Sequence, residues 1–506
     1  MPPRYRPNEG LQIGVCMFRE GFVWGAGSSA LQIEGAAAQD GRAPSIWDTL
    51  CRRPGAIANS DVNDVCCDHY NRMPEDVALM ARMGLKAYRF SVAWPRVLPL
   101  GIGKVNEAGL SFYDRLVDEL LANNIEPWLT LYHWDLPQAL FDRGGWLSPE
   151  IPAWFAEYTR VMVDRLSDRV TNWITINEPQ IFIGLGYREG KHAPGLKLSM
   201  REQLTAAHNV LLAHGRSVQV IRERAKKKAS IGWAPVGRVD YPVTETKDQI
   251  DAARRSSFGI TEKDFWNNTW FGDPVCLGRY PEDGVKLFGK DMPRIEKGDM
   301  ETIHQKIDFY GVNIYSGMPV RTNASGIAEA VPPVAGAPAT LMRWSISPKS
   351  LYWGPRFLHE RYKLPIVITE NGMANMDWVA SDGRVHDAQR IDFTRQYLLE
   401  LARAGKDGVP VDGYFHWSIL DNFELAEGFK DRFGLIYVDF ATQKRTLKDS
   451  AYWYAEVIRT NGDHLSDASP FAAASGATLT GAPGRKDVIV SKPGARKPAA
   501  ILPGGR

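Results

Sequence analysis

Eight short apolar runs recur along the chain, and longer segments of mixed polarity separate them. The runs begin at Phe22, Lys86, Glu126, Thr171, Ala229, Asp308, Pro365 and Gly413. Their apolar residues are nearly continuous and do not alternate with polar ones, which is typical of parallel strands buried on both faces of a sheet. The pattern therefore predicts eight parallel strands.

The segments between these runs carry apolar residues at helical spacing. In segment 73–84, Val77, Met80 and Met83 recur at that spacing, and Gly84 can end the helix. Residues 149–168 and 203–228 show longer helical patterns. The second of these ends in a basic run, 226–228, where cations complement the helix dipole.

Strands that alternate with helices over roughly 440 residues predict the fold class α/β, with a single (β/α)8 TIM barrel over residues 18–460. The active site of such a barrel lies at the C-terminal ends of the strands. A doubly wound open sheet is the alternative. It would usually show a GxGxxG turn after the first strand, but GAGSSA lacks the third glycine, so we discount a dinucleotide site.

The two ends of the chain differ in composition from the middle. Residues 1–17 show little periodicity and predict a flexible N-terminal segment. Residues 461–506 are rich in Ala, Gly, Pro and Ser, and six Lys or Arg against three Asp leave them a net charge of +3. Such a segment buries too little apolar surface to offset its ordering entropy, which predicts a disordered basic tail. A further irregular stretch, residues 322–340, predicts a long loop.

Composition and charge exclude several classes of function. The chain has 61 Lys and Arg against 59 Asp and Glu, so there is no electrostatic argument for nucleic acid or a membrane as a partner. The five cysteines form no CxxC pair, and no two histidines share a metal-ligand spacing with a carboxylate. No stretch reads as a signal peptide or membrane span. We therefore expect a cytoplasmic protein with free thiols, no metal and no cofactor.

Polar and aromatic side chains gather where the predicted strands end. In strand order these are Gln32 and Glu34, Arg89, His133 and Trp134, Asn177 and Glu178, Trp233, Asn313 and Tyr315, Glu370 and Asn371, and finally Trp417 with Asp421, Asn422 and Glu424. Glu178 and Glu370 end apolar strands on opposite sides of a small barrel mouth. For each of these two glutamates, the alternative is a salt bridge at the rim of the barrel, because burying an unpaired carboxylate costs free energy. Two carboxyl groups that face each other across a cleft are the catalytic groups of most glycoside hydrolases.

That chemistry needs one carboxylic acid to protonate the leaving oxygen and one carboxylate to attack the anomeric carbon. Arg89 and the Tyr315 hydroxyl are candidates to keep the nucleophile ionised. Sixteen tryptophans are more than we expect at this length, and their flat faces suit sugar rings. The residues predicted to bind sugar hydroxyls are Gln32, His133, Asn177 and Glu424, and those predicted to stack on sugar rings are Trp134, Trp344 and Trp417. His133 and Trp344 could instead be core residues, and the role of His192 stays open.

Eight segments resemble, in order, those of the family 1 glycoside hydrolases, the β-glucosidase family. They cover roughly Phe22 to Arg459 and read FVWGAGSSALQIEGA, RFSVAWPRVLP, TLYHWDLPQAL, TINEP, HNVLLAHG, WFGDPV, ITENG and WSILDNFELAEGFKDRFGLIYVD. The resemblance implies a (β/α)8 barrel and hydrolysis with retention at the anomeric carbon. It implies that Glu178 is the acid/base and that Glu370 is the nucleophile. It further implies that the residues in contact with the sugar are Gln32, His133, Asn177, Glu424 and Trp417. It also implies that Asn313 and Tyr315 support the catalytic site, and that Trp344 lines the side where the leaving group binds.

Two departures from the family pattern bear on the substrate. Leu425 stands where the family's glucosidases usually have a tryptophan that donates to a sugar hydroxyl, and one neutral hydrogen bond is worth about 0.5–1.5 kcal/mol. The phospho-glycosidase branch has a serine at position 424 and a lysine and a tyrosine further on. This chain has Glu424, Asp431 and Phe433 at those positions, which disfavours a 6-phosphate substrate.

We therefore expect a retaining β-glucosidase that removes terminal non-reducing β-D-glucosyl residues from short oligosaccharides, as in cellulose degradation, or from aryl glucosides. Its partner would be a small-molecule β-glucoside, and its oligomeric state is not determined by the sequence. One alternative is an enzyme of broad β-glucosidase, β-galactosidase and β-fucosidase activity, and another is a transglycosylating enzyme. A non-catalytic sugar-binding barrel is a further alternative.

Overall fold

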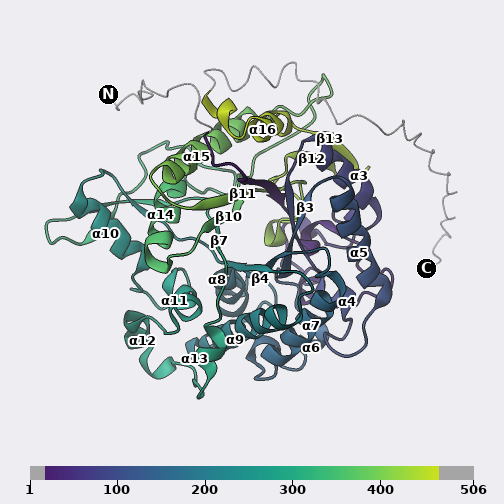
Figure 1. Ribbon diagram of the computed structural model, residues 1–506, viewed down its shortest axis with the longest axis horizontal. Coiled ribbons are helices and arrows are strands. Elements are labelled where there is room, and N and C mark those ends of the chain that lie inside the picture. Colours follow the sequence, from purple (N-terminus) through teal and green to yellow (C-terminus); the bar gives the residue numbers. More distant parts are fainter. Residues whose placement is uncertain (1–16, 467–506) are drawn as a thin grey trace, which may run out of the picture.

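The computed structural model describes residues 17–466, which form a ring of parallel strands surrounded by helices (Figure 1). The barrel strands are β1 (Val23–Gly27), β2 (Ala87–Ser91), β3 (Glu126–Tyr132), β4 (Asn172–Asn177), β5 (Ser230–Ala234), β7 (Tyr310–Asn313), β10 (Ile366–Asn371) and β11 (Val411–Trp417). They pair in parallel in the order β5-β4-β3-β2-β1-β11-β10-β7. The predicted strands and the (β/α)8 barrel are confirmed.

The two ends of this strand series meet and nearly close the barrel. The Asp308 N–H donates to the Ile231 carbonyl over 2.7 Å, and the Gly237 N–H donates to the Asn313 carbonyl over 2.8 Å. A parallel bridge joins Val236 to Asn313. The loops that follow β5 and β7 are therefore neighbours at the C-terminal mouth of the barrel.

Large side chains fill the interior of the barrel opposite glycines. The Trp128 ring lies 5.3 Å from that of Phe309 and 5.0 Å from that of Phe415, and all three are buried. A Cβ atom at Gly25 would lie 2.4 Å from the Phe415 ring, and one at Gly232 would lie 2.3 Å from the Phe309 ring. The interior is a packed core, so any site must lie at the mouth of the barrel.

Helices cover the outside of the ring, and no helix within residues 17–466 is long and apolar enough to cross a membrane. The longer ones are α3 (His69–Arg82), α5 (Glu107–Ala122), α7 (Ile151–Leu166), α9 (Met200–Arg224), α14 (Ser350–Tyr362), α15 (Ala388–Lys406) and α16 (Asp449–Arg459). Short helices follow the first four strands, namely α1 (Ala30–Ile33), α2 (Ile46–Leu50), α4 (Trp94–Val97), α6 (Gln138–Phe141) and α8 (Pro179–Ile183). Between β5 and β7 lie α10 (Lys247–Phe258), α11 (Thr269–Leu277), α12 (Glu282–Phe288) and α13 (Asp299–Ile303).

Two small sheets stand beside the barrel. The first pairs β6 (Asp240–Pro242), β8 (Met318–Thr322) and β9 (Ala328–Ala330), and the second pairs β12 (Ile436–Asp439) with β13 (Lys444–Leu447). The β8–β9 hairpin occupies part of the predicted long loop 322–340. Its turn is held by the Asn323 carboxamide oxygen, which accepts from the N–H groups of Ser325 and Ile327 at 3.0 Å each. The amino-acid composition of segment 322–340 does not indicate these local hydrogen bonds.

The predicted end segments fall largely outside the described residues, since 1–16 and 467–506 are not described. The boundary at 461 is wrong, because 461–466 continue the ordered chain and include a 3-10 turn, η6 (Asp463–Ser466). Asn461 accepts from the Trp24 indole over 2.9 Å and donates to the Phe18 carbonyl over 2.8 Å. Tertiary contacts with the start of the barrel thus order residues whose own composition predicts disorder.

Candidate active site

One cavity of about 470 Å³ opens at the C-terminal ends of the barrel strands. Two predicted site residues, Arg89 and Asn177, do not line it. They lie directly behind it, where both are fully buried. The predicted site residues that line the cavity are Gln32, His133, Trp134, Glu178, Asn313, Tyr315, Trp344, Glu370, Trp417, Glu424, Leu425 and Phe433. The ends of six barrel strands, β1, β3, β4, β7, β10 and β11, or the loops that follow them, thus supply the predicted residues of one cavity.

Glu370, near the end of β10, has a donor on each carboxylate oxygen. Arg89 Nη1 lies 2.5 Å from Oε1, and the Tyr315 hydroxyl donates to Oε2 over 2.6 Å. The same guanidinium donates to the Thr369 carbonyl over 3.1 Å, which fixes its orientation. Because a cation and a hydroxyl both stabilise the charged form, this position favours a carboxylate in a defined orientation.

Glu178 follows β4 directly and lies in a different environment. It is 7% exposed, and Asn313 Nδ2 donates to its Oε1 over 2.9 Å. Burial, followed by the negative charge of Glu370, raises the pKa of Glu178 well above its usual range. The protonated form of Glu178 is therefore favoured, so the carboxyl opposite Glu370 can hold a proton.

Asn177 links the two glutamates from behind the cavity. Its carboxamide oxygen accepts from Arg89 Nη2 at 2.5 Å and from Asn313 Nδ2 at 3.1 Å. Its amide nitrogen must therefore face His133 Nε2, which lies 3.2 Å away. Burial and then the charge of Arg89 lower the pKa of His133 well below its usual range, so the ring is neutral with its proton on Nδ1. That Nδ1 is buried and has no hydrogen-bond partner among residues 17–466.

Gln32 and Glu424 form the polar end of the cavity. The Gln32 amide donates to Asn422 Oδ1 and to the Phe423 carbonyl, both at 3.0 Å, and to Glu424 Oε2 at 3.3 Å. Burial raises the pKa of Glu424 to about 8, with further contributions from Glu370 and then Asp431. Glu424 is thus largely protonated at neutral pH and can both donate to and accept from a ligand hydroxyl.

Aromatic rings line the remaining walls of the cavity. The Trp417 ring stacks on that of His133 at 5.6 Å with an interplanar angle of 16°. Trp344 lies 5.1 Å from Tyr315 and 6.1 Å from Phe433, measured between ring centroids. Flat apolar faces beside hydroxyl-binding groups match the two kinds of surface that a sugar ring presents.

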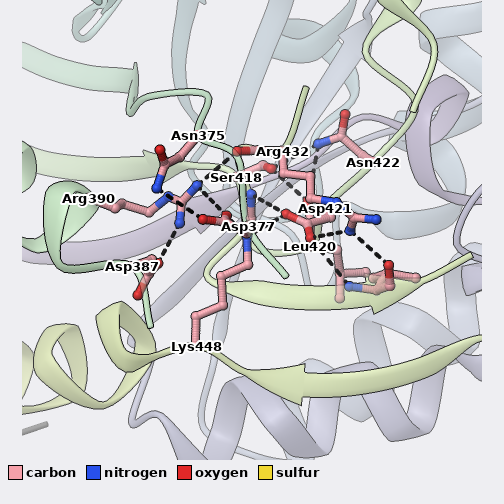
Figure 2. Close-up of polar contacts among 12 residues, drawn as sticks. Asn375, Asp377, Asp387, Arg390, Ser418, Leu420, Asp421, Asn422, Arg432 and Lys448 are labelled. Carbon is pink, nitrogen blue, oxygen red and sulfur yellow. Dashed lines mark hydrogen bonds and ion pairs between the residues drawn. The ribbon is translucent and has the colours of Figure 1, made fainter. Parts of the chain in front are cut away.

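Behind the segment 417–433, which carries Trp417, Glu424 and Phe433, lies a buried group of charges that we call the ion cluster. Its members are Asp377, Asp387, Arg390, Asp421, Arg432 and Lys448 (Figure 2). Lys448 Nζ lies 2.5 Å from Asp377 and 2.6 Å from Asp421, and Arg432 lies 2.7 Å from Asp421. Arg390 pairs with Asp377 at 2.7 Å and also with Asp387. The cluster ties Asp421 to Lys448, directly before α16, and the Arg432 carbonyl accepts from Arg390 Nη2 of α15 over 2.8 Å.

Sequence reasoning missed several residues at the site. Thr369 donates to Asn313 Oδ1 over 2.6 Å and so orients the amide that reaches Glu178. His192, whose role was open, lines the cavity with its ring 5.8 Å from that of Trp134. Trp134, Glu178 and Leu425, all lining the cavity, have left-handed backbones with φ of 81°, 45° and 55°. Such conformations are rare for these residue types and often mark functional sites, but sequence shows no signal for them.

No three His, Cys, Asp or Glu side chains within residues 17–466 are placed to hold a metal ion together. What the cavity offers instead is Glu370 paired with Arg89 and Glu178 in its protonated form, among hydroxyl-binding groups. This arrangement can deliver a proton and a nucleophile to the same bond.

The family model for glycosyl hydrolase family 1 matches residues 15–463. The chain is 45% identical to beta-glucosidase A of Thermotoga maritima over 89% of this chain and 99% of the relative. It is also 45% identical to a 1,4-beta-D-glucan glucohydrolase of Thermotoga neapolitana, over 88% of this chain and 99% of that one. The solved structure of the Thermotoga maritima beta-glucosidase in complex with glucoimidazole superimposes with a TM-score of 0.81, covering 88% of this chain and all of the other. This chain belongs to glycosyl hydrolase family 1.

Proposed function

We propose that this enzyme is a retaining β-glucosidase in which Glu370 is the nucleophile and Glu178 the acid/base. The observation that carries the proposal is the asymmetry between these two carboxyls. Arg89 and Tyr315 favour a charged Glu370, whereas burial and the charge of Glu370 keep a proton on Glu178. Two carboxyls with different protonation states are what the double-displacement reaction requires.

In the first step, a Glu370 oxygen attacks the anomeric carbon as the bond to the leaving oxygen breaks, and Glu178 transfers its proton to that oxygen. The product is a glycosyl ester of Glu370. Esterification removes the negative charge that helps raise the pKa of Glu178, so Glu178, having given up its proton, stays deprotonated and is available to accept one. In the second step it takes a proton from water as the water oxygen attacks the anomeric carbon and releases Glu370.

A substrate panel tests this proposal directly. We expect the chain to hydrolyse p-nitrophenyl β-glucoside and to release β-glucose first, as followed by proton NMR of the anomeric hydrogen before mutarotation. Initial release of α-glucose would exclude the covalent intermediate. Comparison with the 6-phosphoglucoside should favour the unphosphorylated sugar. The nearby cations are already paired, Lys430 with Glu427 and Asp431, and Arg432 with Asp421.

A second candidate is a broad β-glucosidase, β-galactosidase and β-fucosidase activity. The supporting observation is that Leu425 lines the cavity and offers no hydrogen-bond donor to a sugar hydroxyl. Rates on the β-galactoside and β-fucoside within about tenfold of the glucoside rate would support it, since tenfold corresponds to about 1.4 kcal/mol. Transglycosylation and a cytoplasmic location stay predictions.

A further inference from the structure

A second cavity, of about 540 Å³, lies beside the catalytic one, and we call it the outer cavity. The two cavities share four lining residues, namely Gly237, Asp264, Trp266 and Ser316. The β6–β8–β9 sheet, through residues such as Asp240, Val320 and Ala330, forms one wall of the outer cavity. A ligand extending from the catalytic cavity past the shared residues would therefore enter the outer one.

The outer cavity lies on the side of the barrel mouth away from Gln32, Trp417 and Glu424. Those residues follow or end β1 and β11, whereas the shared Gly237 and Ser316 follow β5 and β7. In the pairing order, β5 adjoins the Glu178 strand β4, and β7 adjoins the Glu370 strand β10. The outer cavity thus lies beyond the two catalytic carboxyls, on the side where a leaving group would extend.

The loop between the two cavities is held firmly. The Gln180 side chain, two residues after Glu178, accepts from the Val236 N–H and donates to the Val236 carbonyl, both at 3.2 Å. Arg238 donates to the Trp266 carbonyl over 3.2 Å, and the Trp266 N–H donates to Asp264 Oδ1 over 2.9 Å. The boundary residues therefore have fixed backbone positions relative to the proton donor.

The chemistry of the outer cavity suits a neutral sugar. Trp266 is 50% exposed although it is large and apolar, so a flat indole faces both cavities without a protein partner covering it. The deepest acid, Asp240, is already satisfied by Arg238 at 3.3 Å and by Ser256 at 2.6 Å. Polar side chains around an exposed aromatic ring favour a polyhydroxylated ring over an ion or a purely apolar group.

We infer that the outer cavity extends the leaving-group side of the site, with Trp266 as a platform for a sugar ring beyond the scissile bond. The preferred substrates are then β-linked oligosaccharides of three or more sugars. This inference rests on the proposed function, since it takes the catalytic cavity to hold the non-reducing end. The outer cavity, at about 540 Å³, is similar in size to the catalytic one, so it has room for a whole sugar ring.

The test compares kcat/KM for cellotetraose with that for p-nitrophenyl β-glucoside. In the wild type we expect kcat/KM to rise from cellobiose to cellotetraose. Trp266→Ala should lower the cellotetraose to aryl-glucoside ratio by roughly tenfold, as expected for the loss of an aromatic contact. Ala330 is exposed and lines the outer cavity but not the catalytic one. Ala330→Trp narrows the outer cavity and should therefore lower the same ratio.

Trp378→Ala is the matched control, because Trp378 is 65% exposed and lines neither cavity. It should leave the ratio unchanged. Equal losses on both substrates in Trp266→Ala and Ala330→Trp would overturn the inference, as would a wild type with no gain beyond cellobiose. Failure of the proposed function looks different, because the wild type would then not hydrolyse the aryl glucoside at all.

Discussion

The catalytic cavity and the ion cluster are both buried and both rich in carboxyls, but their charges are balanced differently. In the cluster, three aspartates face three cations, and Lys448 is fully buried between two of them. Burial alone would raise the pKa of Asp377, but Arg390 and Lys448 outweigh it and lower that pKa to about 2. In the cavity, Glu370 pairs with Arg89, whereas Glu178 and Glu424 form no ion pair within residues 17–466, and the pKa of Glu424 is instead raised to about 8.

The difference shows that burial alone does not decide what a carboxyl does. Where each acid has its own cation, the charges are fixed and hold segments of the chain together. Where acids outnumber cations, some must carry protons, and those protons become available for hydrogen bonding and transfer. The four changes below alter one region or the other, in order of decreasing expected effect.

Glu370→Gln removes the cavity carboxyl that pairs with Arg89, and it should have the largest effect. Without a nucleophile, kcat on p-nitrophenyl β-glucoside should fall by on the order of 10³-fold or more, as for other nucleophile deletions. Steady-state kinetics measure this loss. Glu126→Gln, at the opposite end of the barrel at the start of β3, is the matched control and should keep wild-type turnover. Near-normal turnover in Glu370→Gln would show that another group is the nucleophile.

Lys448→Met breaks the balance of the ion cluster, leaving Asp377 and Asp421 with one cation each. Breaking a buried ion pair from one side typically costs about 3–5 kcal/mol, so the free energy of unfolding should fall by roughly that amount. Urea unfolding followed by tryptophan fluorescence gives the value. Lys444→Met is the control, because Lys444 lies four residues earlier and is exposed. It should change the free energy of unfolding little. A loss no larger than that of the control would mean that the cluster does not stabilise the fold.

Glu424→Gln tests whether the pKa of Glu424 is raised, through the pH dependence of the free energy of unfolding. Between its ordinary pKa of 4.5 and about 8, folded Glu424 keeps a proton that the unfolded chain releases. Stability should therefore fall as pH rises through this window, by at most about 1.4 kcal/mol per pH unit from this group. The variant should show a shallower decline in melting temperature from pH 5 to pH 8. An unchanged slope would place the Glu424 pKa near its ordinary value.

Leu425→Trp adds a hydrogen-bond donor to a cavity in which acids outnumber cations, and it should have the smallest effect. A gained neutral hydrogen bond is worth about 0.5–1.5 kcal/mol, so KM for the β-glucoside should fall by roughly two- to tenfold. The glucoside to fucoside ratio of kcat/KM reports whether the donor meets a hydroxyl. Leu425→Phe adds a ring without a donor and separates size from hydrogen bonding. If both variants change KM alike, the donor has no role.

Much of the barrel and its site was predictable because both rest on local signals. Runs such as those ending at Glu178 and Glu370 are apolar throughout, and parallel strands place their C-terminal ends at one mouth. Arg89 and Tyr315 were placed beside the nucleophile by their own strand ends, and the hydrogen bonds to Glu370 agree with that placement. Thr369 was not found, because nothing in the sequence indicates which backbone neighbour orients Asn313.

The sequence by itself determined the eight strands, their parallel arrangement and the set of side chains at the mouth, because periodicity and strand ends depend on near neighbours along the chain. Only the tertiary structure decided which acids have cations. Asp377, Asp421 and Lys448 come from distant segments, and their charge state depends on which groups burial brings within a few ångströms. The outer cavity beside Trp266 and the ordering of residues 461–466 arise in the same way, from surfaces that meet only in the folded chain.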